Sequence, residues 1–484
     1  MLYWGAGLIG LICLATALVS CGTVGNPISG TGTGTMNVSL TDPPSCAFPN
    51  GAFDHVYVTI RSVQAHTSAT ADDSSAGWQE LAPQLNTQPK QIDLFAIASN
   101  TCLLTALGSN TALPAGTYQQ IRLLLVPNSG GGPLPVSNAC AGQGFNCVFL
   151  HNVSTPVELQ LSSQADTGLK IPPGQIVGGP ITVGAGASVD LNIDFNTCAS
   201  IIQQGNGQFR LKPVLTAGQV STNNTGISGQ VVDTVTMQPI SLGTNGRVLV
   251  ALEERDNTGT DVIFEQTVAD SNGNFNFCPL PSTATFDVVA VAINDAGVAY
   301  NATVAVGVPG GTNLGKMPLT AETGSSSGPT TFQGFVTAKT GSTAASIDAS
   351  VSALQSISIG NNVTLDVTIP AEDASIDNLS VSSSTACPAG APSNSNCAEY
   401  TLTEPASNPR VGIFSNGTIS SYSTPPATDV LFKIRTNASV PLSGGTSDCL
   451  PSSVTNSQDA SSNPLKAIAG TIVNVKEIDF SGCS

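Results

Sequence analysis

The chain has 484 residues, of which 15 are Lys or Arg and 32 are Asp or Glu, so its formal net charge is −17. The basic residues are scattered singly, and this charge balance would repel a phosphate backbone, which excludes nucleic acid as an expected partner. Only 10% of the residues are charged, and the many Gly, Ser, Thr, Asn, Val and Ala residues are typical of short strands joined by tight turns. The sequence predicts an all-β chain of about three domains.

The amino-terminal segment is the first predicted element. Residues 5–20 carry no charge, and roughly 15 apolar residues are too few to span a bilayer comfortably. The segment ends in Leu18, Val19, Ser20 and Cys21, which resembles the lipobox of bacterial lipoproteins, in which the cysteine thiol receives a diacylglycerol. Residues 1–20 are therefore predicted to be a lipoprotein signal peptide and Cys21 the lipidation site. The alternatives are an uncleaved anchor helix, or an ordinary signal whose cysteine forms a disulfide.

Residues 21–34 are rich in Gly, Ser and Thr and have little to bury, so we predict a flexible tether behind the lipid. Two or three acyl chains together anchor a protein stably. Gly22 resembles the residue that, in bacteria with two membranes, lets a lipoprotein proceed to the outer membrane. The predicted location is thus the bacterial cell envelope, lipid-anchored in the outer membrane, at its periplasmic face or at the cell surface.

Alternating apolar and polar residues mark the strands of a first domain at residues 35–220. Val38 and Leu40 are expected on one face of the strand MNVSLTD, and in HVYVTIRSV we expect Val56, Val58 and Ile60 inside, with His55, Tyr57 and Thr59 outside. The pattern continues through KQIDLFAI, TYQQIRLLLV, PVELQL, VDLNIDF and FRLKPVL. Residues 94–107 are the one place where a short helix is expected.

These phrases and their order resemble the DUF4382 domain of bacterial lipoproteins. They are LTD at residues 40–42, DHVYVTI at 54–60, Trp78 before a loop, IDL at 92–94, GTYQQIRL at 116–123, DLNIDF at 190–195 and LKPVL at 211–215. The resemblance covers nearly the whole first domain. It implies no activity, because none is assigned to the family.

A second domain is predicted at residues 226–319. Its sequence resembles the carboxypeptidase regulatory-like domain, a small transthyretin-like β-sandwich. The matching features are a G-x-V-x-D strand at 229–233, a turn rich in Asp, Asn and Gly before an aromatic residue at 270–275, and an alternating strand at 286–290. This fold is grouped with carbohydrate-binding-like sandwiches, which is an analogy of shape and not evidence for a sugar site.

Residues 320–331 have the composition of a linker, and residues 332–484 are predicted to form a third, β-sandwich-like domain. Its first strand, FQGFVTAKTG, is similar to ISGQVVDTVT in the second domain. The sequence therefore leaves open whether the third domain is an internal duplication of the second. The D-x-x-G-x-F turn of the second domain has no clear copy in the third.

Twelve cysteines are present, and setting aside Cys13 in the leader and Cys21 leaves ten, an even number that indicates disulfides in an exported protein. The expected pairs are Cys46 with Cys102, Cys140 with Cys147, Cys387 with Cys397, and Cys449 with Cys483. Cys198 and Cys278 stay unassigned because they lie in different predicted domains. No CxxC occurs in the sequence, so no metal site is expected.

Three histidines, His55, His66 and His151, lie in the first domain. His55 and His66 would be about 36 Å apart on one straight strand, on opposite faces, so we expect solvent-facing residues and not a shared metal. The pattern HExxH is absent, and GxSxG occurs only as the GSSSG of residues 324–328, inside the predicted linker. The acidic residues show no informative spacing. No catalytic residue and no cofactor is predicted.

Residues 270–274, DSNGN, resemble the start of a calcium loop. Phe275 and Pro281 stand where that loop requires Gly and Glu. We predict instead the tight turn of a hairpin, with Asn272 and Gly273 at positive φ.

Together these features predict a non-catalytic, lipid-anchored envelope protein whose β-sandwich modules have binding or structural roles. The expected partners are the membrane, through the lipid, and a glycan or another envelope protein. A carbohydrate-binding surface lipoprotein is the first alternative, which would be favoured if Trp78 formed a flat exposed platform with Tyr57 or Tyr118. The second is an exported hydrolase, which would need two carboxylates in one cleft about 5 to 9.5 Å apart.

Overall fold

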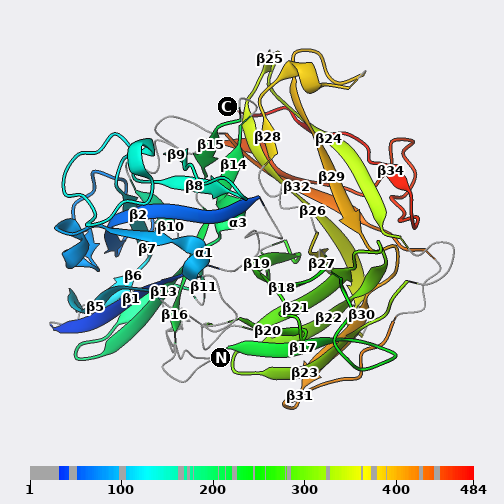
Figure 1. The fold of residues 1–484 in the computed structure, drawn as a ribbon, viewed down its shortest axis with the longest axis horizontal. Coiled ribbons are helices and arrows are strands. Elements are labelled where there is room, and N and C mark those ends of the chain that lie inside the picture. Colours follow the sequence, from blue (N-terminus) through cyan, green and yellow to red (C-terminus); the bar gives the residue numbers. More distant parts are fainter. Residues whose placement is uncertain are drawn as a thin grey trace, which may run out of the picture.

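In a computed structural model of the protein, nearly all regular structure is β-strand, which confirms the predicted fold class (Figure 1). The structure describes residues 32–42, 52–97, 105–161, 168–171, 175–177, 179–204, 207–212, 214–220, 226–243, 246–256, 258–277, 280, 285–322, 328–360, 363–371, 379–388, 390–424, 429–440 and 447–483. The predicted leader, and the predicted tether up to residue 31, lie outside these ranges. Among the helices of the described ranges, none is long and apolar enough to span a membrane.

The first domain contains two large sheets. Sheet A has the strand order β11 (Ile176–Val177), β16 (Leu215–Val220), β13 (Ser188–Phe195), β1 (Thr33–Thr41) and β5 (Thr105–Pro114). Sheet B has the order β10 (Leu169–Ile171), β7 (Gln120–Leu125), β2 (Phe53–His66), β8 (Cys147–Leu150), β9 (Val157–Leu161), β15 (Phe209–Leu211) and β14 (Ile201–Gln203), while β3 (Gln79–Glu80) and β4 (Lys90–Asp93) also pair with β2. A separate ribbon joins β6 (Gly116–Tyr118) and β12 (Ile181–Val183).

Alternation places the apolar side chains of both sheets in one core. Met36, Val38 and Leu40 of β1 are fully buried, and so are Val56 and Ile60 of β2, as the sequence predicts. Successive side chains of a strand point to opposite faces, so one face of each sheet supplies this core. The other faces carry polar residues.

Thr59 departs from the predicted pattern because it is on the outward face and still fully buried. The loop that follows β7 covers it, and the Thr59 hydroxyl donates to the backbone oxygen of Phe145. The predicted short helix is present as α1 (Leu94–Ile97), whereas Thr105 already begins β5. Within the described ranges, further short helices are η1 (Pro83–Asn86), η2 (Ala141–Gln143), α3 (Thr197–Ser200) and η5 (Ser384–Ala386).

Four further sheets form the rest of the described chain. Sheet C has the order β20 (Asn274–Phe277), β17 (Ile227–Asp233) and β23 (Asn313–Leu319). Sheet D has the order β19 (Asp261–Val268), β18 (Arg247–Arg255), β21 (Thr285–Ile293), β22 (Ala299–Pro309), β30 (Arg410–Ser415) and β31 (Thr418–Ile419). Sheet E has the order β27 (Thr364–Ile369), β26 (Ile347–Ser358), β32 (Lys433–Val440) and β33 (Ser447–Asn456), with β28 (Leu379–Val381) beside β26. Sheet F has the order β25 (Thr343–Ala344), β24 (Thr330–Thr340) and β29 (Asn396–Glu404), with β34 (Ile472–Asn474) and β35 (Ile478–Phe480) also beside β24.

Sheet D is buried on both faces. On β21, Val288 and Ala290 belong to the core shared with sheet C, whereas Val289 and Val291 belong to the core shared with sheets E and F. Strands buried on both faces form nearly continuous apolar runs instead of alternating ones. The runs RVLVAL in β18 and FDVVAVAI in β21 have this property.

The predicted boundary between the second and third domains therefore differs from the structure. Strand β30 comes from the predicted third domain, yet it pairs in parallel with β22 of the second, from Thr303 opposite Arg410 to Val306 opposite Ile413. The predicted linker is also partly structured, because Ala321 bridges to Tyr300 and β24 begins at Thr330. Residues 226–319 and 332–484 share a sheet and a core.

The turn at 270–274 has a geometry that occurs four times in the part of the chain that the structure describes. An Asp or Asn Oδ1 accepts the backbone N–H groups two and four residues later, and the N–H three residues later donates to that residue's backbone oxygen. The four turns begin at Asp256, Asp270, Asn294 and Asp459. The fourth residue always has positive φ, and it is Gly except in the last turn, where it is Ser462.

This geometry corrects two details of the predicted hairpin. Of the two candidates in the turn, Gly273 has positive φ and Asn272 does not. The flanking strands β19 and β20 lie in different sheets, so the turn is a corner between sheets C and D. The turn at Asp459 in the third domain has the same geometry, and the D-x-x-G-x-F pattern misses it because Ser462 stands in place of the glycine.

Candidate functional site

The first domain has a loop that a disulfide fastens to the outer face of sheet B. The loop runs over residues 127–146, and Cys140 is bonded to Cys147 at the start of β8, with 5.6 Å between their Cα atoms. Both cysteines are fully buried. The pair is one that the sequence predicts, and its short span of seven residues closes the end of the loop against the sheet.

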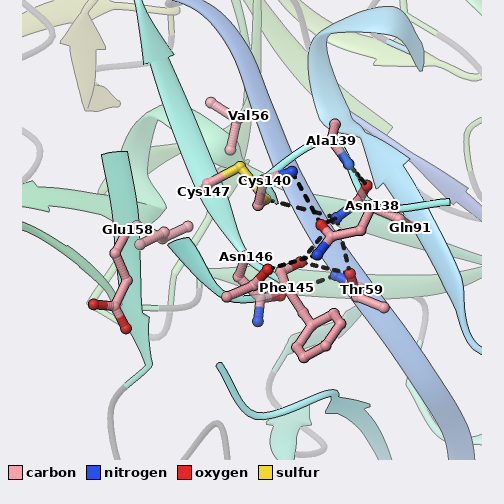
Figure 2. The surroundings of a disulfide bond; sticks show 12 residues. Val56, Thr59, Gln91, Asn138, Ala139, Cys140, Phe145, Asn146, Cys147 and Glu158 are labelled. Atoms are coloured by element: carbon pink, nitrogen blue, oxygen red, sulfur yellow. Dashed lines mark hydrogen bonds between the residues drawn. A yellow bond between two sulfur atoms is a disulfide. The ribbon is translucent and has the colours of Figure 1, made fainter. Parts of the chain in front are cut away.

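Gln91 and Asn146 hold the same loop by side-chain hydrogen bonds. Figure 2 shows Gln91 of β4 between Thr59 and the loop. Its Nε2 donates to Asn138 Oδ1 (2.9 Å) and to the backbone oxygen of Phe145 (3.1 Å), and the N–H of Ala139 donates to its Oε1 (2.7 Å). Asn146 is fully buried, and its Oδ1 accepts the Thr59 N–H at 2.9 Å. The loop is therefore fixed at several points.

A cleft lies between this loop and the segment that joins η1 to β4. Its volume is about 370 Å³, which is within the range of small-molecule sites. The lining combines amide side chains, one Lys, prolines and aliphatic groups: Gln84, Leu85, Gln88, Pro89, Lys90, Gln91, Ala106, Leu107, Pro135, Val136 and Ser137. The Lys90 ammonium donates to the backbone oxygen of Ala106 at 3.1 Å. No carboxylate is in this lining, and Lys90 is its one charged group.

An aromatic cluster lies farther along the same face of sheet B. The rings of His55, Tyr57 and Phe149 are 5.8 Å apart in each pairing, and His55 is directly opposite Phe149 on the neighbouring strand. The Asp93 carboxylate lies 2.7 Å from His55 Nδ1 and accepts its hydrogen bond when that nitrogen carries the proton. Asp93 and the cleft residue Gln91 are two positions apart on β4 and thus share a face.

On this face, the pKa values of titratable groups are shifted by burial and by adjacent side chains. Desolvation, together with the charge of Asp93, raises the pKa of Tyr57. The hydrogen bond from His151 to Asp54, 2.9 Å between Nδ1 and Oδ1, lowers the pKa of the Asp54 carboxyl. Two of the three histidines therefore pair with carboxylates at the same end of sheet B.

Trp78 does not form an exposed aromatic platform with Tyr57 or Tyr118, the arrangement that would favour carbohydrate binding; burial of these residues favours a scaffold instead. Tyr118 is 1% exposed, and its hydroxyl donates to the backbone oxygen of Pro114. Trp78 is half-buried, with the Arg122 guanidinium 4.0 Å above its ring and the His66 ring 5.1 Å away. Only Tyr57 belongs to an aromatic cluster on the open face. The sequence pattern does not single out Phe149. Phe149 is two positions after Cys147 on β8, so the two side chains lie on the same face of that strand.

The expectation that the histidines face solvent is correct for His55 and wrong for His66. His66 is 8% exposed, because the segment after β2 folds back over it. Its Nδ1 accepts the Ser68 N–H at 2.8 Å, and its Nε2 is 3.0 Å from the backbone oxygen of Ala76. Within the described residues, no three His, Cys, Asp or Glu side chains are placed to hold a metal ion.

A second group of acids is buried between sheets D and E. Glu253, Asp261 and Asp287 are at most 6% exposed, and Arg255 reaches Asp261 at 3.2 Å and Asp287 at 3.6 Å. Desolvation, followed by the hydrogen bond with Asp287, raises the pKa of Asp261 to about 8. Glu253 accepts the Thr368 N–H of β27 at 3.1 Å. This group joins β18 to β27 beneath Arg255, instead of facing a cleft.

The other predicted cysteine pairs divide into two classes. Cys387 is bonded to Cys397, and Cys449 is bonded to Cys483, as the sequence predicts. The predicted pair of Cys46 and Cys102 lies outside the described residues, as do Cys278 and the lipidation site Cys21. Cys198 lies in α3.

Replacing Cys140 and Cys147 together by Ser is expected to destabilise the first domain by about 2 to 3 kcal/mol, the value for a short closed loop. Faster amide hydrogen exchange in residues 127–146 should accompany the loss, because one wall of the cleft is then held by hydrogen bonds alone. Replacing Cys387 and Cys397 by Ser is the control and should leave exchange in that loop unchanged. Equal exchange in both double variants would contradict the role given to the first disulfide.

Comparison with known proteins identifies the first domain. Residues 33–213 match the family model described as "Domain of unknown function (DUF4382)", which confirms the resemblance found in the sequence. No curated protein matches the chain. Among solved structures, the chain is similar to a minor pilin of the Gram-positive pathogen Streptococcus agalactiae, with 9% identity over 52% of this chain and 94% of the pilin, and a TM-score of 0.16. It is also similar to the shaft pilin SpaA of Lactobacillus rhamnosus GG, with 11% identity over 60% and 99% of the two chains, and a TM-score of 0.16.

Proposed function

We propose that the protein is a non-catalytic, lipid-anchored component of the bacterial cell envelope, and that its DUF4382 domain binds a ligand in the cleft beside the disulfide-bonded loop of residues 127–146. The observation that carries the proposal is the cleft itself: a preformed hollow of about 370 Å³ whose polar lining is mostly amides. The Lys90 ammonium, the one charged group of the lining, donates a hydrogen bond to the backbone oxygen of Ala106. Such a lining orients a ligand by hydrogen bonds and supplies no acid–base pair.

The anchor rests on the motif at residues 18–21 and on the composition of the segment after it. A Gly-, Ser- and Thr-rich stretch leads to Thr33, where β1 begins as an interior strand of the first domain's sheet A, between β13 and β5. The first strand thus starts 12 residues after the proposed lipid at Cys21. An outer-membrane location is part of the proposal, and it rests on Gly22.

The anchor is tested by replacing Cys21 with Ser. We expect the variant to lose incorporation of labelled palmitate and to move from the membrane fraction to the soluble fraction. Cys13→Ser is a matched control in the same apolar segment and should behave like the unaltered protein. Membrane partitioning and palmitate labelling that survive Cys21→Ser would overturn the lipid anchor, without bearing on the cleft.

Neutral carbohydrate is the ligand class that the cleft and its surroundings favour. Sugar hydroxyls pair with amides such as Gln84 and Gln88, and the aromatic cluster of His55, Tyr57 and Phe149 offers apolar surface on the same sheet face. A glycan array probed with the purified protein tests this. Binding should be reduced by Gln88→Ala and by Phe149→Ala, and kept by Val235→Ala, an exposed residue of the second domain. Binding that is equal in all three variants would exclude this face.

We also propose that residues 226–319 are a carboxypeptidase regulatory-like module. In support, the three motif segments fall on β17, on the corner turn before β20, and on β21. In this protein, sheet D of the module continues into strands β30 and β31, which come from residues 332–484.

A further inference from the structure

The outer face of sheet A meets strand β19 of sheet D. On β13, Leu191, Ile193 and Phe195 face the core of the first domain, so Asn192 and Asp194 face away from it. These two polar residues are nevertheless only 7% and 5% exposed. Phe264 and Glu265 of β19 line the same small cavity as Asn192 and Asp194, which shows what covers them. The polar face of the DUF4382 domain is therefore an interface with the second domain.

The cavity between these residues is too small for an organic ligand. Its volume is about 20 Å³, room for about one water molecule. Neither carboxylate oxygen of Asp194 has a hydrogen-bond partner among the described residues, and the same is true of the Thr216 hydroxyl beside it. A buried carboxylate without a partner is costly when it is charged and much less so when it is protonated.

The charges around Asp194 are acidic. Burial, followed by the negative charges of Asp194 and Asp42, raises the pKa of Glu265. Burial also raises the pKa of Asp42, and the charges of Asp194 and Asp93 add to this effect. Asp42 Oδ1 accepts the Thr197 N–H at 2.9 Å. Of the strands packed here, β1 and β16 have no titratable residue. The other charged groups on β13, β19 and β18 are Asp190, bonded to Asn37; Asp261, bonded to Arg255; and Glu253, Glu254 and Arg247.

A second contact joins the same two parts of the protein. Arg210 of β15 bonds Asp348 of β26 at 2.6 Å, and the two side chains are 16% and 4% exposed. This ion pair connects the first domain to sheet E, whereas the carboxylates connect it to sheet D. The interface thus has one end held by opposite charges and one end where like charges meet.

We propose that this second end is a proton-dependent latch: the DUF4382 domain docks on β19 while Asp194 or Glu265 carries a proton, and the contact opens when both are charged. The latch is independent of the lipid anchor and of any ligand in the cleft. It makes the angle between the first domain and the rest of the protein a function of pH.

The direction of the pH dependence follows from the raised pKa values. Burial raises the pKa of Asp194 from its ordinary value of 3.8 to about 8, and burial together with Asp194 and Asp42 raises the pKa of Glu265. The docked form therefore binds more protons than the open form between about pH 4 and pH 8, so docking weakens as the pH rises through this window. For one group whose pKa is about 8 in the docked form and has its ordinary value in the open form, the docking equilibrium falls about ninetyfold between pH 6 and pH 9.

Distance measurements between spin labels test the latch in the purified protein. Labels on non-natural side chains at Ser109 in the first domain and Val235 in the second, both exposed, avoid the cysteines. With EDTA present, we expect one narrow distance distribution at pH 6 and a broad one at pH 9. Asp194→Asn and, from the other side of the interface, Glu265→Gln should each keep the narrow distribution at pH 9.

Asp190→Asn is the matched control, because Asp190 lies on the same strand and is bonded to Asn37 outside the cavity. It should open like the unaltered protein. The proposal is overturned if the distribution of the unaltered protein is the same at pH 6 and pH 9, or if Asp194→Asn and Glu265→Gln open as it does. Recovery of the narrow distribution by calcium at pH 9 would also overturn it, since the cavity would then hold a metal ion instead of a proton. Circular dichroism at pH 9 checks that each variant is folded.

Discussion

A fragment of residues 226–319, the predicted second domain, is expected not to fold when it is produced alone. Without β30 and sheets E and F, one face of sheet D loses its cover, and Leu249, Val289, Val291, Val304 and Val306 become exposed. Burying one such side chain is worth about 1.5 to 3 kcal/mol, so five are worth roughly 8 to 15 kcal/mol. This is comparable to the whole stability of a typical domain.

Residues 33–220 and 226–483 are the fragments to compare, because each keeps its own sheets and core together. We expect dispersed amide signals in the nuclear magnetic resonance spectra of both, and a collapsed spectrum or precipitation for 226–319. A well-dispersed spectrum from residues 226–319 would show that the second domain is independent and that the shared core contributes little.

Replacing Phe332 by Ala is expected to destabilise residues 226–483 by about 3 to 5 kcal/mol. Phe332 of β24 is fully buried, and its ring centre lies 5.0 Å from that of Phe432, which comes from the segment before β32. The substitution leaves a cavity where sheets E and F meet. Urea denaturation with the disulfides intact measures the loss.

Val235→Ala is the control for this experiment, because Val235 is 87% exposed and a surface substitution of this kind changes stability by no more than about 0.5 kcal/mol. Since the core of Phe332 extends to Val289 on sheet D, the unfolding of sheet D should shift to lower urea together with that of sheets E and F. A loss below about 1 kcal/mol, or an unchanged transition for sheet D, would contradict a common core.

Strand alternation predicts the first domain well and the second less well, for a physical reason. In β1 and β2 one face is apolar and the other polar, so a period of two identifies both the strand and its inner face. In β18 and β21 both faces are apolar, and the sequence cannot say which neighbour covers which face. The uninterrupted run FDVVAVAI is the signal that a second cover is needed, but that cover comes from sheets E and F, whose strands lie between Thr330 and Phe480.

The candidate site was predictable only in its cysteines. Cys140 and Cys147 bracket a Gly- and Asn-rich loop, and their pairing follows from short separation. The cleft depends on where Pro135 and Val136 come to lie against η1, and no local pattern specifies such a contact. The latch residues also depend on a contact between distant segments. Strand alternation predicts Asp194 to be an outward, solvated residue of β13, and it is buried only because β19 packs over that face.

The place of the carboxyl-terminal strands in sheet F determines when the protein can finish folding. Strands β34 and β35 add in parallel to β24, some 140 residues earlier in the chain, and the disulfide of Cys449 with Cys483 fastens the last residues to β33. As the chain is made, the first domain can close once Val220 has emerged. Strands β18, β21 and β22 of sheet D are made by Pro309, whereas the sheets that cover their second face are complete only at Phe480, about a third of the chain later, so during synthesis this face is vulnerable to aggregation and to proteases.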